Sequence, residues 1–193
     1  KKANIMIDFL KEIEQHFNGT VKKDILKIGV PNSFARIHMP QMLMQYLEQY
    51  NHLQIRTVSN TSDNIIQQLT SGSIDIGIIC GDYPYIGEKV CLLDEEMYMV
   101  TQKGVRFEDI EKYTLIESYY NPLVKLMVNQ WWQSHFGEIP RDTYTVTHAD
   151  IAIEMVESGI GVTFVFGSKW KINEEKLQKL PVYDRHGDIV SRK

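Results

Sequence analysis

The hydrophobic residues near the start of the chain repeat with the period of a helix. Between residues 3 and 17 they recur at every fourth position, while charged residues fill the opposite side; the recurring residues are Ile5, Phe9, Ile13 and Phe17. This spacing predicts an amphipathic helix that ends at Asn18-Gly19. The apolar face of such a helix needs a partner, which is either its own domain or a second subunit.

From residue 25 onward, short apolar runs alternate with helical patterns. Strands are predicted at 25–30, 53–58 and 74–80. One helix is predicted over 34–50, and another follows the capping residues at 60–63. Strands that are joined through helices by short connections form a parallel sheet, so this region predicts an α/β lobe.

A second alternation of the same kind follows. Its strands are predicted at 97–102, 114–117, 144–146 and 162–166, and its helices at 122–136 and 149–158. Trp131 and Trp132 are neighbours on the first of these helices, and we expect them to divide between core and surface.

These two sets predict an α/β fold with two Rossmann-like lobes. We expect the chain to cross between the lobes near 94–96, so that residues 25–95 form the first lobe and 96–193 the second. After residue 181 we expect one final strand, with the segment that would return to the first lobe missing.

Composition narrows the class of protein without identifying it. Of the 193 residues, 43% are hydrophobic and 24% are charged, as in an ordinary globular protein. The formal net charge of -4 argues against DNA binding by this segment itself, because nucleic-acid-binding modules carry a basic face. With two cysteines and no apolar run near the ~20 residues of a membrane span, we expect a cytoplasmic chain without a disulfide framework or a membrane contact.

Small and polar residues gather where the predicted strands end. Open parallel sheets bind ligands beyond the carboxyl ends of their strands, where helix N-termini present unpaired N–H groups. Such groups suit a carboxylate or a similar small anion. N-capping is the alternative role for each hydroxyl or amide at a helix start. The candidate ligand-binding residues are Asn32, Ser33, Thr61, Ser62, Cys80, Gly81, Tyr119, Thr147, His148 and Phe166.

The common catalytic motifs are absent from the sequence. It contains no G-x-S-x-G, P-loop, H-E-x-x-H, G-x-G-x-x-G or C-x-x-C pattern, and its histidines lack metal-ligand spacing. An enzyme would have to rely on Asp82, His148 or Cys80. Cys80 is either a redox sensor or a small buried side chain. We therefore expect no catalysis, metal or cofactor.

Two stretches carry a resemblance to a known family. They are Ser71-Gly72-Ser73-Ile74-Asp75-Ile76-Gly77-Ile78 and Met155-Val156-Glu157-Ser158-Gly159-Ile160-Gly161-Val162. Together with 26–30, which leads to Met39-Pro40, they resemble the effector-binding domain of LysR-type transcription regulators over most of the chain.

The resemblance implies a fold similar to type 2 periplasmic-binding proteins, with two lobes, two crossing strands and a small-molecule effector in the cleft. It implies a winged helix-turn-helix before this segment, through which alone DNA would be bound, and a homodimer or homotetramer. Residues 1–20 would then be the end of a linker helix that pairs with another subunit. Ser33, Thr61, Ser62 and Thr147 match the family's effector-contacting hydroxyls. The alternatives are a solute receptor of a transporter and an enzyme on the same scaffold.

Overall fold

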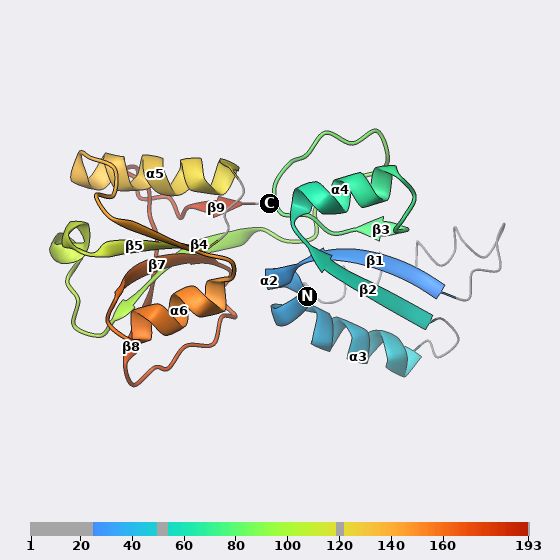
Figure 1. Cartoon of the computed structure of the whole chain (residues 1–193), viewed down its shortest axis with the longest axis horizontal. Coiled ribbons are helices and arrows are strands. Elements are labelled where there is room, and N and C mark those ends of the chain that lie inside the picture. Colours follow the sequence, from blue (N-terminus) through green and yellow to red (C-terminus); the bar gives the residue numbers. More distant parts are fainter. Residues whose placement is uncertain (1–24, 50–53, 119–121, 193) are drawn as a thin grey trace. The chain divides into compact units, whose positions relative to one another are not determined.

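The structure is a computed structural model that describes residues 25–49, 54–118 and 122–192 (Figure 1). The chain divides into two compact units, of which the first ends at Leu93 and the second spans Asp94–Arg192. The helix predicted over 3–17 and the linker predicted over 1–20 lie outside the described residues.

The first unit is built on a parallel sheet of three strands. Strand β1 (Ile25–Pro31) lies between β2 (Gln54–Asn60) and β3 (Ile76–Gly77), which confirms the predicted α/β pattern. Every second residue of β1 is apolar, so Leu26, Ile28 and Val30 all point into the core.

The opposite face of β1 packs closely on helix α4 (Ser62–Thr70). Gly29 makes this approach possible, because a Cβ atom there would lie 2.5 Å from Cδ1 of Ile74 and 3.2 Å from Cγ2 of Ile65. Ile65 is fully buried between the helix and the sheet. The start of α4, which carries predicted site residues, is thereby held against the central strand.

The single helix predicted over 34–50 is wrong, because two helices occupy this region. Helix α2 (Asn32–Ile37) ends at His38, and α3 (Met39–Gln49) follows at once. Pro40 has no N–H to donate to the preceding turn, and inside a continuous helix its ring would clash with the carbonyl group of Arg36, so the helix breaks before this point.

The third predicted strand is much shorter than expected. Only Ile76–Gly77 forms β3, whereas the apolar run extends to Cys80. In this sheet β3 pairs only with β1. The last backbone hydrogen bond between the two segments runs from Ile78 N to Gly29 O at 2.8 Å. Beyond that point β1 continues only to Pro31, which has no N–H to donate to a neighbouring strand, so the pairing with β3 ends.

The second unit has a mixed sheet in the order β6-β5-β7-β4-β8, with β9 paired to β4. Strand β5 is parallel to β6 and β7, while β4 is antiparallel to β7, β8 and β9. The strands are β4 (Glu95–Gln102), β5 (Thr114–Ser118), β6 (Thr143–Val146), β7 (Gly161–Phe166), β8 (Leu177–Pro181) and β9 (Ser191–Arg192). Strand β8 and the 3-10 helix η1 (Phe107–Lys112) were not predicted from the sequence.

Helices α5 (Pro122–Phe136) and α6 (Ala149–Glu157) cover opposite faces of this sheet (Figure 1). The expectation that Trp131 and Trp132 divide between core and surface is wrong, since both are buried. The segment after β8 contacts α5, where the Trp131 indole N–H donates to the backbone oxygen of Tyr183 at 2.7 Å. Both rings pack against Phe164.

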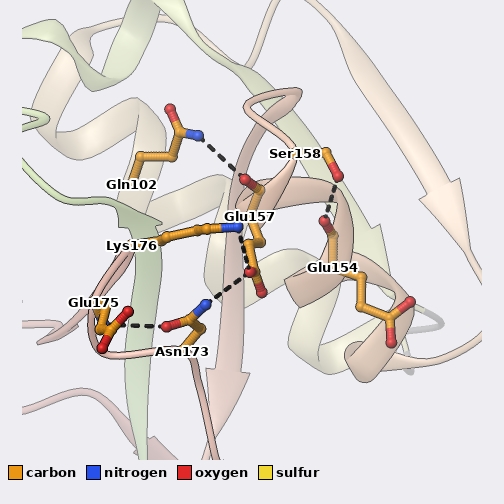
Figure 2. A network of polar contacts seen from close by, with 7 residues as sticks. All are labelled: Gln102, Glu154, Glu157, Ser158, Asn173, Glu175 and Lys176. Carbon is orange, nitrogen blue, oxygen red and sulfur yellow. Dashed lines mark hydrogen bonds and ion pairs between the residues drawn. The ribbon is translucent and has the colours of Figure 1, made fainter.

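A polar network holds the end of α6 (Figure 2). The Glu157 carboxylate accepts a hydrogen bond from Asn173 Nδ2 at 2.8 Å and lies 3.1 Å from Lys176 Nζ. Its backbone oxygen accepts from Gln102 Nε2 at 3.3 Å. The hydrogen bond from Asn173, followed by that from Lys176, lowers the pKa of Glu157 below its usual value. The network ties α6 to β4 and to the loop before β8.

Candidate functional site

The carboxyl ends of the three strands of the first unit lie at one edge of their sheet, because all three run parallel. The Ser59 hydroxyl at the end of β2 donates to the Asn32 side-chain oxygen at the start of α2. The Cys80 backbone N–H donates to the Ser62 Oγ at 3.0 Å. Hydrogen bonds therefore join all three strand ends, and predicted residues from each take part.

Thr61 and Ser62 lie at the start of α4 and have different surroundings. Thr61 is the N-cap, and its Oγ1 accepts from Asn64 N at 3.5 Å, so the capping alternative applies to it. Ser62 is buried and accepts from Cys80 N. A hydroxyl accepts and donates at the same time, so this contact leaves the Ser62 hydrogen available for an acceptor on a ligand.

The remaining candidates of the first unit differ in exposure. Asn32 is exposed and Ser33 half-buried at the start of α2, where no side chain caps the helix. Cys80 is half-buried, and Gly81 beside it has a φ of 97°. This backbone conformation favours glycine, which explains the residue type without a ligand.

In the second unit, the candidates follow β6 and β7. Thr147 and His148 are exposed in front of α6, where His148 is the N-cap position and makes no side-chain cap bond to the helix. Phe166, at the end of β7, is 4% exposed. Tyr119 lies outside the described residues. The roles assigned to these side chains from the sequence stay predictions.

Two charged residues that the sequence did not indicate lie at the same edge of this sheet. Because β4 runs antiparallel to β7, its first residue, Glu95, lies at the edge where β7 ends. Arg192 on β9 pairs with Glu95, and its Nη2 and Nε lie 2.8 and 3.1 Å from Glu95 Oε2. The Arg192 guanidinium lies 4.2 Å from the centre of the Phe166 ring. No sequence signal links these residues, since 97 positions separate the pair.

The side chains that could act as metal ligands or as a catalytic acid or base are spread over the described residues. Within them, no group of three or more histidine, cysteine or acidic side chains lies close enough together to hold a metal ion. Asp82, a candidate acid or base, forms an exposed ion pair with Lys89 at 2.7 Å. In the same parts of the chain, no helix has the length and apolar character needed to cross a membrane.

Comparison with known proteins identifies related sequences. Residues 20–185 match the model of a family described as the LysR substrate binding domain. YkuM of Bacillus subtilis (strain 168), an uncharacterized HTH-type transcriptional regulator, is 26% identical over 95% of this chain. YraN of the same organism, described in the same words, is 22% identical over 82% of the chain. The aligned regions span 61% of YkuM and 56% of YraN, so this chain corresponds to little more than half of either protein.

Solved structures share the fold. The effector binding domain of BenM with its effector benzoate has a TM-score of 0.71 and 18% identity, covering 90% of this chain and 82% of that one. The OxyR2 E204G regulatory domain from Vibrio vulnificus has a TM-score of 0.70 and 15% identity, with 90% and 86% covered. A full-length BenM E226K mutant has a TM-score of 0.65 and 20% identity, with 96% and 67% covered. At these identities the likeness shows the fold alone.

Proposed function

The chain belongs to the family of LysR substrate binding domains, and we propose that it senses a small organic anion for a DNA-binding transcription regulator without transforming that anion. The family match over 20–185 supports the sensing role. The curated relatives are HTH-type regulators in which a further part of the protein lies outside the aligned region, and that part is where we place the DNA-binding module. Benzoate as the effector of BenM supports a carboxylate as the ligand class.

The observation that carries this proposal is the joined carboxyl edge of the first unit. Backbone and side-chain groups from all three strand ends meet there through the Ser59–Asn32 and Cys80–Ser62 hydrogen bonds. Hydroxyl and N–H groups beside a helix start suit the oxygen atoms of a carboxylate. A set of such groups that is already positioned binds with little loss of side-chain entropy.

Regulation requires the ligand to favour one arrangement of the regulator over another. A ligand shifts such an equilibrium only by the difference between its affinities for the two arrangements. We therefore propose that the regulator is a homodimer or homotetramer, located in the cytoplasm with the DNA that it controls. Ligand binding changes how its DNA-binding modules engage the operator.

A thermal-shift screen tests this function directly. Organic acids and amino-acid derivatives are added to the chain, each beside its neutral amide, and a bound acid should raise the melting temperature by mass action. The bound compound is then recovered and compared with the starting material by mass spectrometry. Recovery of the unchanged acid supports sensing, whereas a converted product would show an enzyme, and the absence of any stabilising acid would refute the proposal.

The Thr147→Val substitution tests one predicted contact. It removes an exposed hydroxyl at nearly constant shape, so the melting temperature without ligand should stay the same. The affinity for a stabilising acid should fall roughly 5- to 10-fold if that hydroxyl donates to the ligand, since a hydrogen bond contributes about 1 kcal/mol. Thr143→Val, at the exposed start of β6 and the opposite end of that strand, is the matched control. Equal affinities of both variants and the parent chain would exclude Thr147 from the site.

A further inference from the structure

Arg192 is the one arginine within the described parts of the chain that is not solvent-exposed. Its side chain is 15% exposed and that of its partner Glu95 is 14% exposed. Taking a guanidinium out of water is unfavourable, and exchanging a buried ion pair for apolar side chains is often neutral or stabilising. The fold by itself therefore gives little reason for an arginine at this position.

The hydrogen-bonding capacity of Arg192 is only partly used. A guanidinium has five N–H groups, and one from Nε and one from Nη2 donate to Glu95 Oε2. The other three N–H groups have no hydrogen-bond acceptor in the described residues. The side chain as a whole keeps 15% of its exposure.

The guanidinium is also held in a defined orientation. Its carbon lies over the Phe166 ring, 4.2 Å from the ring centre, where a cation–π contact holds it. Glu95 is packed in turn, because a Cβ on Gly167 would lie only 3.2 Å from its Oε1. Gly167 N donates to the backbone oxygen of Glu96 at 2.9 Å, which fixes the end of β7 beside the start of β4. An arginine fork held in this way loses little entropy when it binds an anion.

The place of Arg192 in the sheet agrees with a binding role. It lies beside the first residue of β4, and therefore at the edge where β5, β6 and β7 end. Planar guanidinium groups match the two oxygens of a carboxylate better than lysine ammonium groups do.

We propose, on the basis of the effector-sensing function above, that Arg192 is the carboxylate-binding residue of the second unit and binds a small organic carboxylate through its unused N–H groups. Phe166 and Glu95 are positioning residues in this arrangement. Phe166, which the sequence suggested as a ligand contact, acts instead by holding the guanidinium over its ring. Glu95 orients the guanidinium, and its negative charge lowers the affinity of Arg192 for a second carboxylate.

The side-chain Nε–H resonance of Arg192 in a nitrogen-15 NMR spectrum reports on this site directly. The signal is assigned by its disappearance in Arg192→Lys, and the probes are acetate, succinate and benzoate, each paired with its neutral amide. Arg185 provides the internal control, because its Nε also donates within the protein, to Ser134 O at 2.7 Å, but its side chain is exposed. We expect a saturable shift of the Arg192 signal with at least one carboxylate, no shift with the amide, and no saturable shift at Arg185.

Two variants separate binding from a purely structural role. Glu95→Gln keeps the shape of the pair but removes the competing charge, so carboxylate affinity should rise at least about threefold. Glu95→Gln combined with Arg192→Gln leaves a neutral pair without an unpaired buried charge, and carboxylate affinity should fall at least about tenfold. A structural pair predicts no change in affinity in either variant.

The outcomes distinguish this inference from the broader function. If an acid from the thermal-shift screen stabilises the parent chain and the double variant equally, the effector-sensing function stands and the role of Arg192 is refuted. If no carboxylate produces a saturable shift at Arg192, its role is likewise refuted. If the acid that shifts the Arg192 signal is recovered as a converted product, the anion site stands and the sensing function falls.

Discussion

Replacing Gly29 by alanine should destabilise the first unit through a steric conflict with one atom. The new Cβ would lie 2.5 Å from Cδ1 of Ile74, whereas carbon atoms pack best at about 3.5–4.0 Å. Either the buried Ile74 side chain must adopt another rotamer or the loop that carries it, between α4 and β3, must shift. Overpacking of this kind costs about 1–3 kcal/mol, against which the lower entropy of the unfolded alanine chain returns about 0.4–1 kcal/mol.

A second substitution tests this explanation, because valine lacks the Cδ1 atom. Ile74→Val alone should cost about 0.5–1.5 kcal/mol through the lost methyl group. In the double variant the nearest remaining atom is Cγ2 of Ile65 at 3.2 Å, which must yield by only a few tenths of an ångström. The double variant should therefore be more stable than the sum of the single effects predicts, by about 1 kcal/mol.

Amide hydrogen exchange measured on peptides from β1 is the suitable assay, because all three tryptophans lie in the second unit and their fluorescence reports on that unit. The free energy of opening β1 is compared among the parent chain, both single variants and the double variant. Strictly additive effects would refute the assigned conflict, and so would a Gly29→Ala variant as stable as the parent chain. Gly104→Ala is unsuitable as a control, because Gly104 has a φ of 84° and alanine would strain the backbone whatever the space around it.

Two further predictions concern the second unit. The pKa of Glu157 is lowered in the folded chain, so its ionised form stabilises the fold above the unfolded-state pKa, and this contribution is lost as the pH falls through the folded-state value. Urea titrations at several pH values should therefore show a smaller loss of stability between about pH 6 and pH 3 for Glu157→Gln than for the parent chain. The control Glu154→Gln replaces an exposed carboxylate and should leave that loss unchanged. Equal pH profiles for the parent chain and Glu157→Gln would contradict this explanation. Trp131→Phe removes an indole hydrogen bond as well as volume and should cost about 1 kcal/mol more than Trp132→Phe in urea unfolding, because Trp132 has no such bond among the described residues; equal costs would show that volume alone matters.

Much of the fold was predictable because its signals are local. The helix expected over 122–136 has these bounds in the structure, and Thr61 occupies the N-cap position that its sequence context indicated. The strands around 114–117 and 162–166 appear within one residue of their predicted bounds. In each case apolar periodicity and capping chemistry lie within a few neighbouring residues, where short-range sterics decide the outcome.

The wrong predictions of secondary structure and burial have two different causes. The break between α2 and α3 follows from Pro40, whose effect on a helix is local and was open to prediction. The short β3 and the burial of Trp131 depend instead on which distant segment lies beside them. The pairing of β3 ends where its neighbour β1 approaches Pro31, which has no N–H to donate, and Trp131 donates a hydrogen bond to the backbone oxygen of Tyr183.

The features of the candidate site also fall into a part that the sequence predicts and a part that depends on the tertiary structure. The sequence by itself determined that small and polar residues such as Ser62 stand at strand ends beside helix starts, and its motifs indicated the family. Only the tertiary structure decided that Ser62 meets the Cys80 backbone and that Arg192 lies over Phe166 beside Glu95. The physical reason is the range of the interactions: capping and periodicity act within a turn or two, whereas the order of strands in a sheet decides which side chains from distant segments meet.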